Sequence, residues 1–132
     1  MNILITGAFG FVGTNLSKAI KQQGQHQVFA LDVMEAPKHN YDAFFSWDNL
    51  SNLDWNNIDC IIHLAGKAHD TKNTTEEQAY FDINLGLTKK IVEHFLQSNA
   101  QKFIFFSSVK AVADTVKGEF FTEYEVPDTG TP

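Results

Sequence analysis

The 132-residue chain contains no arginine, and its ten basic residues, all lysines, are scattered rather than clustered. Acidic residues outnumber them, which leaves a formal net charge of −6 at pH 7. Proteins that bind DNA or RNA need basic patches against the phosphate backbone. The composition therefore argues against a nucleic-acid partner.

Cysteine and long apolar runs are also scarce. The single cysteine, Cys60, excludes an internal disulfide, and its place in the apolar run Ile58–Leu64 predicts a small core residue. No apolar run approaches the roughly 18 residues of a transmembrane helix, so we expect no membrane partner. The N-terminal MNILITG lacks a basic region and a cleavage site, and we therefore expect no signal peptide and a cytoplasmic protein.

Short apolar runs alternate with longer amphipathic stretches, a pattern typical of βαβ units around a parallel sheet. Residues 1–132 suit one domain, and twelve phenylalanines predict a core rich in aromatic side chains. Right-handed crossovers would place five strands in the order 3-2-1-4-5, with helices on both faces. The strands are expected at Asn2–Thr6, Gln27–Leu31, Asp42–Trp47, Ile58–Leu64 and Lys102–Phe106.

Two helices are expected between these strands. Phe11–Gln23 places four apolar residues on one helical face, and a longer helix from about Thr75 to Ser98 repeats apolar residues at helical spacing. Asn49–Leu53 predicts a single helical turn, and Val109–Pro132 has no clear period and predicts loop. The apolar faces consist of Phe11, Leu16, Ala19 and Ile20 in the first helix, and of Tyr80, Ile83, Leu87, Ile91 and Phe95 in the second.

Three glycines, Gly7, Gly10 and Gly13, lie between the first strand and the first helix. A Gly-x-x-Gly-x-x-Gly pattern is a weak signal by itself, but this strand-to-helix context is what a dinucleotide-binding turn requires. Gly7 would allow the tight turn, Gly10 would let backbone amides approach a pyrophosphate, and Gly13 would let the helix approach the strand. The helix N-terminus would then present free N–H groups to the phosphates.

Asp32 ends the second strand, about twenty residues beyond the glycine turn. A carboxylate at that position can accept hydrogen bonds from both ribose hydroxyls of adenosine, and it would repel a 2′-phosphate. Because the chain also lacks the arginine that usually binds a 2′-phosphate, the sequence favours NAD over NADP as the cofactor. The alternative is an ordinary solvated aspartate at a strand end.

These features, with three further segments, resemble the extended short-chain dehydrogenase/reductase family. Asp59–Gly66 is similar to the family's fourth strand and its His-Leu-Ala-Gly end, and Asp82–Thr88 to its Asn-(apolar)-x-Gly-Thr segment. Phe105–Val109 is similar to its fifth strand and active-site serine. The resemblance implies an NAD-dependent epimerase/dehydratase with a Rossmann-type α/β fold. It is strongest to UDP-sugar 4-epimerases of polysaccharide synthesis, with dehydratases, 4-keto reductases and a non-catalytic dinucleotide-binding module as alternatives.

The resemblance also implies roles for individual residues. Ser108 would be the catalytic hydroxyl that binds the 4-oxygen of a UDP-sugar, and Asn84 would lie on the nicotinamide side. Each has a structural alternative: Asn84 could make a purely structural hydrogen bond within its helix, and Ser108 could cap a turn. His63 is expected to be a structural residue of its strand and not a catalyst. No metal site is implied. The implied cofactor-binding residues are Gly7, Gly10, Phe11, Val12, Gly13, Asp32, Leu64, Ala65, Gly66, Asn84 and Ser107.

The chain departs from the family pattern at several points. Leu87 stands at a usual glycine position, and Val112 and Ala113 where a Tyr-Gly pair is common. In this family a tyrosine and a lysine four residues later carry the proton transfer, and no Tyr-x-x-x-Lys occurs here. We therefore expect the N-terminal part of a larger enzyme, truncated after the fifth strand, without its substrate domain and inactive by itself. The exposed edge Phe103–Phe106 would favour self-association or a homodimer.

Overall fold

The computed structural model of the chain describes residues 1–66, 77–108, 118, 122 and 124, with the backbone alone for residues 77–81. Most of the expected loop Val109–Pro132, the expected helix start at Thr75 and the side chain of Tyr80 lie outside the described residues.

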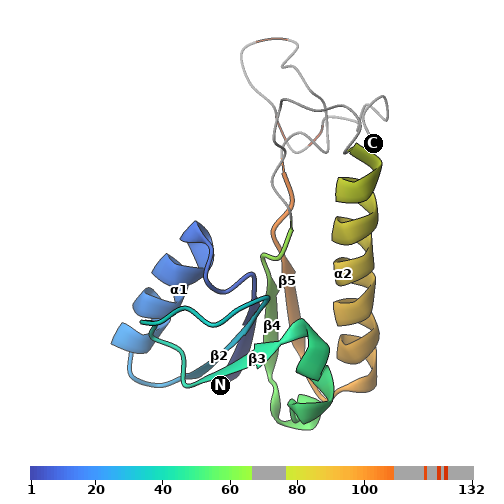
Figure 1. The fold of residues 1–132 in the computed structure, drawn as a ribbon. Helices are drawn as coiled ribbons and strands as arrows, with labels where there is room; N and C mark the ends of the chain where they lie inside the picture. The colour runs from blue at the N-terminus through green and yellow to red at the C-terminus, as the bar shows by residue number, and fades with distance from the viewer. Residues whose placement is uncertain (67–76, 109–117, 119–121, 123, 125–132) are drawn as a thin grey trace.

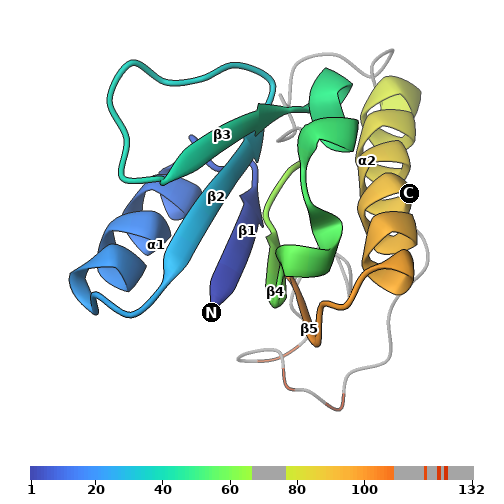
Figure 2. The same cartoon turned by 90° about the horizontal axis from the view of Figure 1, so that it is seen from below.

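Five parallel strands form one sheet in the order β3-β2-β1-β4-β5, as the sequence predicted (Figure 2). The apolar runs form these strands because a parallel sheet is covered on both faces. Their ends lie within two residues of the expected ones. The strands are β1 (Asn2–Thr6), β2 (Gln27–Asp32), β3 (Ala43–Ser46), β4 (Cys60–His63) and β5 (Lys102–Phe105).

The α-helices lie on opposite faces of the sheet (Figure 1). Helix α1 (Phe11–Gln22) follows β1, and helix α2 (Glu77–Gln97) precedes β5. Two 3₁₀ helices connect β3 to β4, η1 (Trp47–Asn52) and η2 (Trp55–Asn57). The expected turn at Asn49–Leu53 largely coincides with η1, whereas η2 carries no periodic signal and was not expected.

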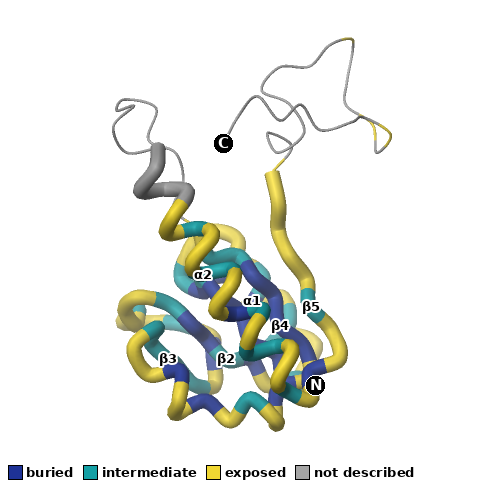
Figure 3. The backbone as a smooth tube through the Cα atoms, turned by 90° about the vertical axis from the view of Figure 1, so that its right-hand side faces the viewer, coloured by how far each residue is buried: buried dark blue, intermediate teal, exposed yellow. Residues whose placement is uncertain are grey.

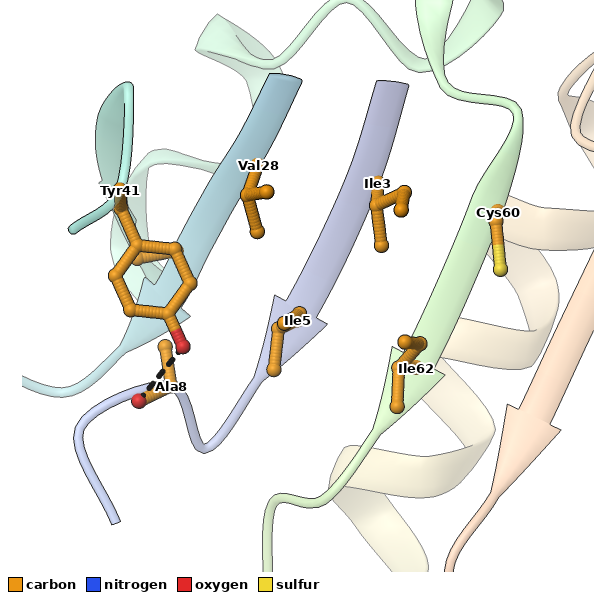
Figure 4. Close-up of a cluster of buried hydrophobic side chains, with 8 residues drawn as sticks. Ile3, Ile5, Ala8, Val28, Tyr41, Cys60 and Ile62 are labelled. Carbon is orange, nitrogen blue, oxygen red and sulfur yellow. Dashed lines mark hydrogen bonds between the residues drawn. The ribbon is translucent and has the colours of Figure 1, made fainter. Parts of the chain in front are cut away.

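The core consists of two layers, one on each face of the sheet, because side chains alternate along each strand. Aliphatic residues of β1, β2 and β4 pack under α1, and Figure 4 shows this layer, in which Cys60 is buried as predicted. On the other face, Leu4, Leu31 and Ile61 pack against Ile91 of α2. Figure 3 shows the buried backbone concentrated in the central strands.

The expectation of an aromatic-rich core is wrong for the residues that the structure describes. Tyr41 is the one Phe, Tyr or Trp among the buried hydrophobic residues there. The described phenylalanines are partly buried at the margins of the two layers or exposed, as Phe29 and Phe103 on one hand and Phe11 on the other illustrate. Branched aliphatic side chains fill the space between helix and sheet, and the larger rings close its periphery.

The predicted apolar faces of both helices need correction. Phe11 is 86% exposed and Ala19 is also exposed, whereas Gly13 and Ser17 are the buried residues of α1. Together with the half-buried Leu16 and Ile20, they form the packed face at the 3- and 4-residue spacing of a helix. Small residues occupy it because the helix lies close to the turn that precedes it.

In α2, Ile91 is fully buried and Leu87 and Phe95 are half-buried, as predicted, but Ile83 is exposed. The inner face passes through Asn84 and Thr88 instead, both of which are half-buried. None of the helices in the described part of the chain is long and apolar enough to span a bilayer.

Strand β5 forms one edge of the sheet. Ile104, Phe105 and Phe106 are each about half exposed there, whereas Phe103 is half-buried. Edge strands with exposed apolar side chains pair readily with other chains. The apolar edge is thus as expected, and self-association through it stays a prediction.

Candidate functional site

The candidate site lies where the carboxyl ends of the parallel strands meet. The glycine turn follows β1, Asp32 ends β2, Leu64–Gly66 follows β4, and Ser107 and Ser108 follow β5. Strand β1 pairs with β2 on one side and with β4 on the other. This switch point is where open α/β sheets bind their ligands. Tertiary structure therefore brings the predicted residues to one edge of the sheet.

Two glycines of the turn are required by backbone geometry. Gly7 has a positive φ of 66°, and a Cβ there would lie 2.8 Å from the nitrogen of Ala65. A Cβ on Gly13 would lie 2.4 Å from the carbonyl oxygen of Ala8. Neither backbone atom can move away as a flexible side chain could. The roles predicted for Gly7 and Gly13, a tight turn and close helix packing, agree with these distances.

Some backbone N–H groups of the glycine turn donate hydrogen bonds within the protein, and others have no acceptor among the described residues. The Phe9 N–H donates to Asp32, and the Gly10 N–H donates to the Gly7 carbonyl at 3.2 Å. In the described part of the chain, nothing accepts a hydrogen bond from the N–H of Phe11 or Val12, and the N-cap Gly10 has no side chain to do so. These first-turn amides of α1 are suited to an anion.

Asp32 is tied to the turn by its carboxylate. Its Oδ2 accepts from the Phe9 N–H at 2.9 Å, and its Oδ1 accepts from the Val33 N–H at 2.7 Å. It is therefore not simply a solvated residue at the end of a strand. Each oxygen keeps a second lone pair that could accept a hydroxyl.

Tyr41 supports the glycine turn through its side chain, and the sequence did not identify it as a site residue. Its buried hydroxyl lies 2.8 Å from the carbonyl oxygen of Ala8 (Figure 4) and 2.9 Å from that of Gly13. The single hydroxyl proton is shared between these two acceptors. Burial raises the pKa of Tyr41 to about 12, so the phenol keeps its proton at neutral pH. Phe9 packs edge-on against its ring at 5.7 Å. Sequence offers no signal for this role, because Tyr41 follows a loop and belongs to no motif.

Asn84 and Gly66 lie next to each other although eighteen residues separate them along the chain. A Cβ on Gly66 would lie 3.5 Å from Oδ1 of Asn84, which is ordinary van der Waals contact. Asn84 also accepts, through its backbone carbonyl, the hydroxyl of Thr88 at 2.9 Å. The structure thus places Asn84 beside the loop that follows β4, and its predicted role on the nicotinamide side stays a prediction.

His63 is a satisfied structural residue, as predicted. It is fully buried, with Nδ1 at 2.6 Å from the hydroxyl of Thr6 and Nε2 at 2.9 Å from the hydroxyl of Thr88. Burial lowers the pKa of His63 below its usual value. The sequence predicted no contact between either threonine and His63, although Thr88 ends the Asp82–Thr88 segment, because that contact exists only once β1, β4 and α2 are assembled.

Ser107 and Ser108 are exposed after the end of β5. The Phe106 N–H donates to the His63 carbonyl at 3.2 Å and anchors the start of this segment beside β4. The half-buried Leu64 is held similarly, by its N–H on the Thr6 carbonyl at 3.1 Å. Among the residues that the structure describes, no three His, Cys, Asp or Glu side chains are grouped to hold a metal.

Comparison with known proteins adds a family and several relatives. Residues 3–132 match the family described as "NAD dependent epimerase/dehydratase family". A UDP-glucose 4-epimerase of Vibrio cholerae is 29% identical over 116 residues, which cover 83% of this chain and 35% of that protein. A UDP-glucose 4-epimerase of Neisseria meningitidis is 25% identical over 148 aligned residues, covering 99% of this chain and 43% of that protein.

A solved structure shares both the fold and part of the sequence. It is a UDP-glucuronic acid 4-epimerase from Bacillus cereus, in complex with UDP-4-deoxy-4-fluoro-glucuronic acid and NAD. It matches with a TM-score of 0.78 at 25% identity, over 97% of this chain and 46% of that chain. The present chain thus spans less than half the length of each of these three proteins.

The close packing at Gly13 predicts opposite effects of alanine at two helical glycines. Gly13→Ala should lower the free energy of unfolding by about 1–3 kcal/mol, because its Cβ meets the Ala8 carbonyl. Gly86→Ala, with nothing within 4 Å of its Cβ, should raise it by about 0.5–1 kcal/mol. Urea unfolding of both variants checks this, and equal shifts would contradict the packing described.

Burial of neutral His63 predicts that acid destabilises the fold. Between the lowered pKa of the folded state and the ordinary value near ~6.5 of the unfolded chain, only the unfolded chain binds the proton. This contribution to stability is thus complete above the unfolded pKa and is lost as the pH falls below it. Urea unfolding from pH 7.5 to 5.0 should show a shallower decline in His63→Gln than in the wild type. An unchanged decline would refute the assignment.

Proposed function

The chain belongs to the NAD-dependent epimerase/dehydratase family, and on this premise we propose that residues 1–132 form the NAD-binding part of a nucleotide-sugar 4-epimerase. The family resemblance drawn from the sequence is thereby confirmed, as is NAD as the cofactor of the family. The observation that carries the proposal is the pair of unengaged amides at Phe11 and Val12, next to the carboxylate of Asp32.

The turn fits the phosphates of a dinucleotide. A pyrophosphate needs N–H donors and a backbone that it can approach closely. The start of α1 offers the donors at Phe11 and Val12 and the side-chain-free backbone at Gly10. Gly7 and Gly13 keep the turn compact, because a Cβ at either position would collide with the backbone of Ala65 or of Ala8. Asp32, held by Phe9 N–H, would accept the hydroxyls of the adenosine ribose.

The nicotinamide half of the cofactor would lie on the β4 side of the switch point. Leu64, Ala65 and Gly66 would contact it through their backbone, Asn84 would lie beside it, and Ser107 would approach its ribose. When bound, NAD supplies the acceptor for a hydride removed from a sugar carbon. The hydroxyl of Ser108 would hydrogen-bond the 4-oxygen of a UDP-sugar and orient that carbon.

A UDP-sugar is the proposed substrate because the relatives named above are UDP-sugar 4-epimerases. A dehydratase or 4-keto reductase of the same family would use the same cofactor site. A non-catalytic dinucleotide-binding module is the candidate from a different class, and it would use the same cofactor site. A cytoplasmic location and a role in polysaccharide synthesis belong to the proposal as predictions.

The cofactor site predicts a preference for NAD that depends on Asp32. Isothermal calorimetry with the intact protein should show NAD binding at least about tenfold tighter than NADP, because the carboxylate accepts ribose hydroxyls and repels a 2′-phosphate. Asp32→Asn should narrow this preference, whereas Asp48→Asn, which removes an exposed carboxylate on η1, should keep it. Equal binding of both cofactors by the wild type would contradict the proposed specificity.

The proposed reaction predicts that the full-length protein interconverts a UDP-sugar and its C4 epimer. Ser108→Ala should lower kcat by about 100-fold or more, because the sugar loses the hydroxyl that orients it, while Ser51→Ala, at an exposed position of η1, should not. Chromatography of UDP-glucose and UDP-galactose after incubation measures the product. NAD binding without turnover of any UDP-sugar would favour the non-catalytic module.

A further inference from the structure

A continuous chain of hydrogen bonds links the ends of β1 and β4 to α2, next to the candidate site. It begins at the Ala65 N–H, which donates to the Thr6 hydroxyl at 3.1 Å. It passes from that hydroxyl to Nδ1 of His63 at 2.6 Å, and from Nε2 of His63 to the Thr88 hydroxyl at 2.9 Å. It ends at the Asn84 carbonyl, 2.9 Å from the Thr88 hydroxyl. We refer to Thr6, His63 and Thr88 as the buried relay.

The two ends of the buried relay determine the direction of every bond in it. A carbonyl can only accept, so the single hydroxyl proton of Thr88 goes to Asn84, and Thr88 must accept from Nε2–H of His63. An amide N–H can only donate, so Nδ1 of His63 is the one acceptor within the buried relay for the hydroxyl proton of Thr6. The neutral tautomer with hydrogen on Nε2 alone satisfies both ends of the chain at once.

Within the described residues, Thr6 and Thr88 are the hydrogen-bond partners of the His63 ring. Thr6 and His63 are fully buried, and the rings of Phe103 and Phe105 on β5 lie 6.2 and 5.7 Å from the imidazole. Among the described residues, no buried side-chain nitrogen or oxygen lacks a hydrogen-bond partner. Removing one hydroxyl from the buried relay would thus leave the imidazole with an unsatisfied buried nitrogen.

The ends of the buried relay coincide with the proposed nicotinamide side of the site. Ala65 is the residue whose backbone packs against Gly7, and Asn84 is the residue whose side chain lies against Gly66. The residues proposed for the ADP half, Asp32 and the first turn of α1, have separate supports in Phe9 N–H and Tyr41. The two halves of the site are thus held by different hydrogen bonds.

We propose that His63, held as the neutral Nε2–H tautomer between Thr6 and Thr88, is a positioning residue that aligns Ala65 with Asn84 for the nicotinamide half of NAD. The inference rests on the proposed function of the site as an NAD site. His63 touches no substrate in this proposal. It acts through the backbone of Ala65 and of Asn84, and the same bonds tie the end of β4 to α2.

The tautomer can be read directly by NMR of the intact protein labelled with ¹⁵N-histidine, without any ligand. At pH 7 the expected spectrum shows a protonated Nε2 and an unprotonated Nδ1 for His63, identified by loss of its signals in His63→Gln. A protonated Nδ1, whether in the other tautomer or in the imidazolium, would overturn the proposal.

The positioning role can be separated from a merely structural one by binding NAD and ADP to two variants of one residue. Thr88→Val removes the hydroxyl at nearly constant volume, and Thr88→Ser keeps the hydroxyl. Calorimetry should show that Thr88→Val weakens NAD binding about tenfold, the effect of one hydrogen bond, while ADP binds as in the wild type. Thr88→Ser should bind both like the wild type.

Three results would count against the positioning role. These are unchanged NAD binding in Thr88→Val, an equal loss of NAD and ADP binding in that variant, and a loss in Thr88→Ser as large as in Thr88→Val. Failure of the wild type to bind NAD would instead remove the proposed function, and the tautomer experiment would still test the buried relay. If Thr88→Val does not fold, Thr6→Ser and Thr6→Val provide the same comparison at the other end.

Discussion

The site depends on the contact between Gly7 and the loop that follows β4. A Cβ at Gly7 would lie 2.8 Å from the Ala65 nitrogen and 2.9 Å from its Cα, so the two turns touch through backbone alone. Because β1 lies between β2 and β4 in the sheet, this contact joins the two halves of the edge. A side chain there would separate the glycine turn from Ala65, and the left-handed φ would strain it further.

Hydrogen bonds from buried or half-buried side chains hold the rest of the edge around that contact. The Tyr41 hydroxyl shares its one proton between the Ala8 and Gly13 carbonyls, and Asp32 accepts from Phe9. The buried relay holds the β4 side. These bonds engage the carbonyls of Ala8 and Gly13 and the N–H of Phe9. The N–H groups of Phe11 and Val12, at the start of α1, find no acceptor among the described residues. Such pre-organised donors suit a phosphate.

Much of the fold could be predicted because its signals are local. The apolar run Asn2–Thr6 became β1 without change, and the glycine spacing located the start of α1. The packed face of α1 was predicted wrongly. Phe11 is apolar and was therefore assigned to the core, but the helix packs through Gly13, and Phe11 is exposed. The sequence and the resemblance named Asp32 and Asn84 as cofactor-binding residues, and their contacts with a ligand remain predictions.

The sequence by itself determined the strand order, the glycine turn, the family and the acidic residue at the end of β2. These follow from patterns within a few residues or from motifs in a known order. Tertiary structure alone decided the roles of Tyr41, Thr6 and Thr88. Tyr41 lies 33 and 28 residues along the chain from Ala8 and Gly13, and Thr6 and Thr88 lie 57 and 25 residues from His63. A hydroxyl gives no periodic signal, and its hydrogen bonds are set by which backbone groups the assembled strands and helices leave within reach.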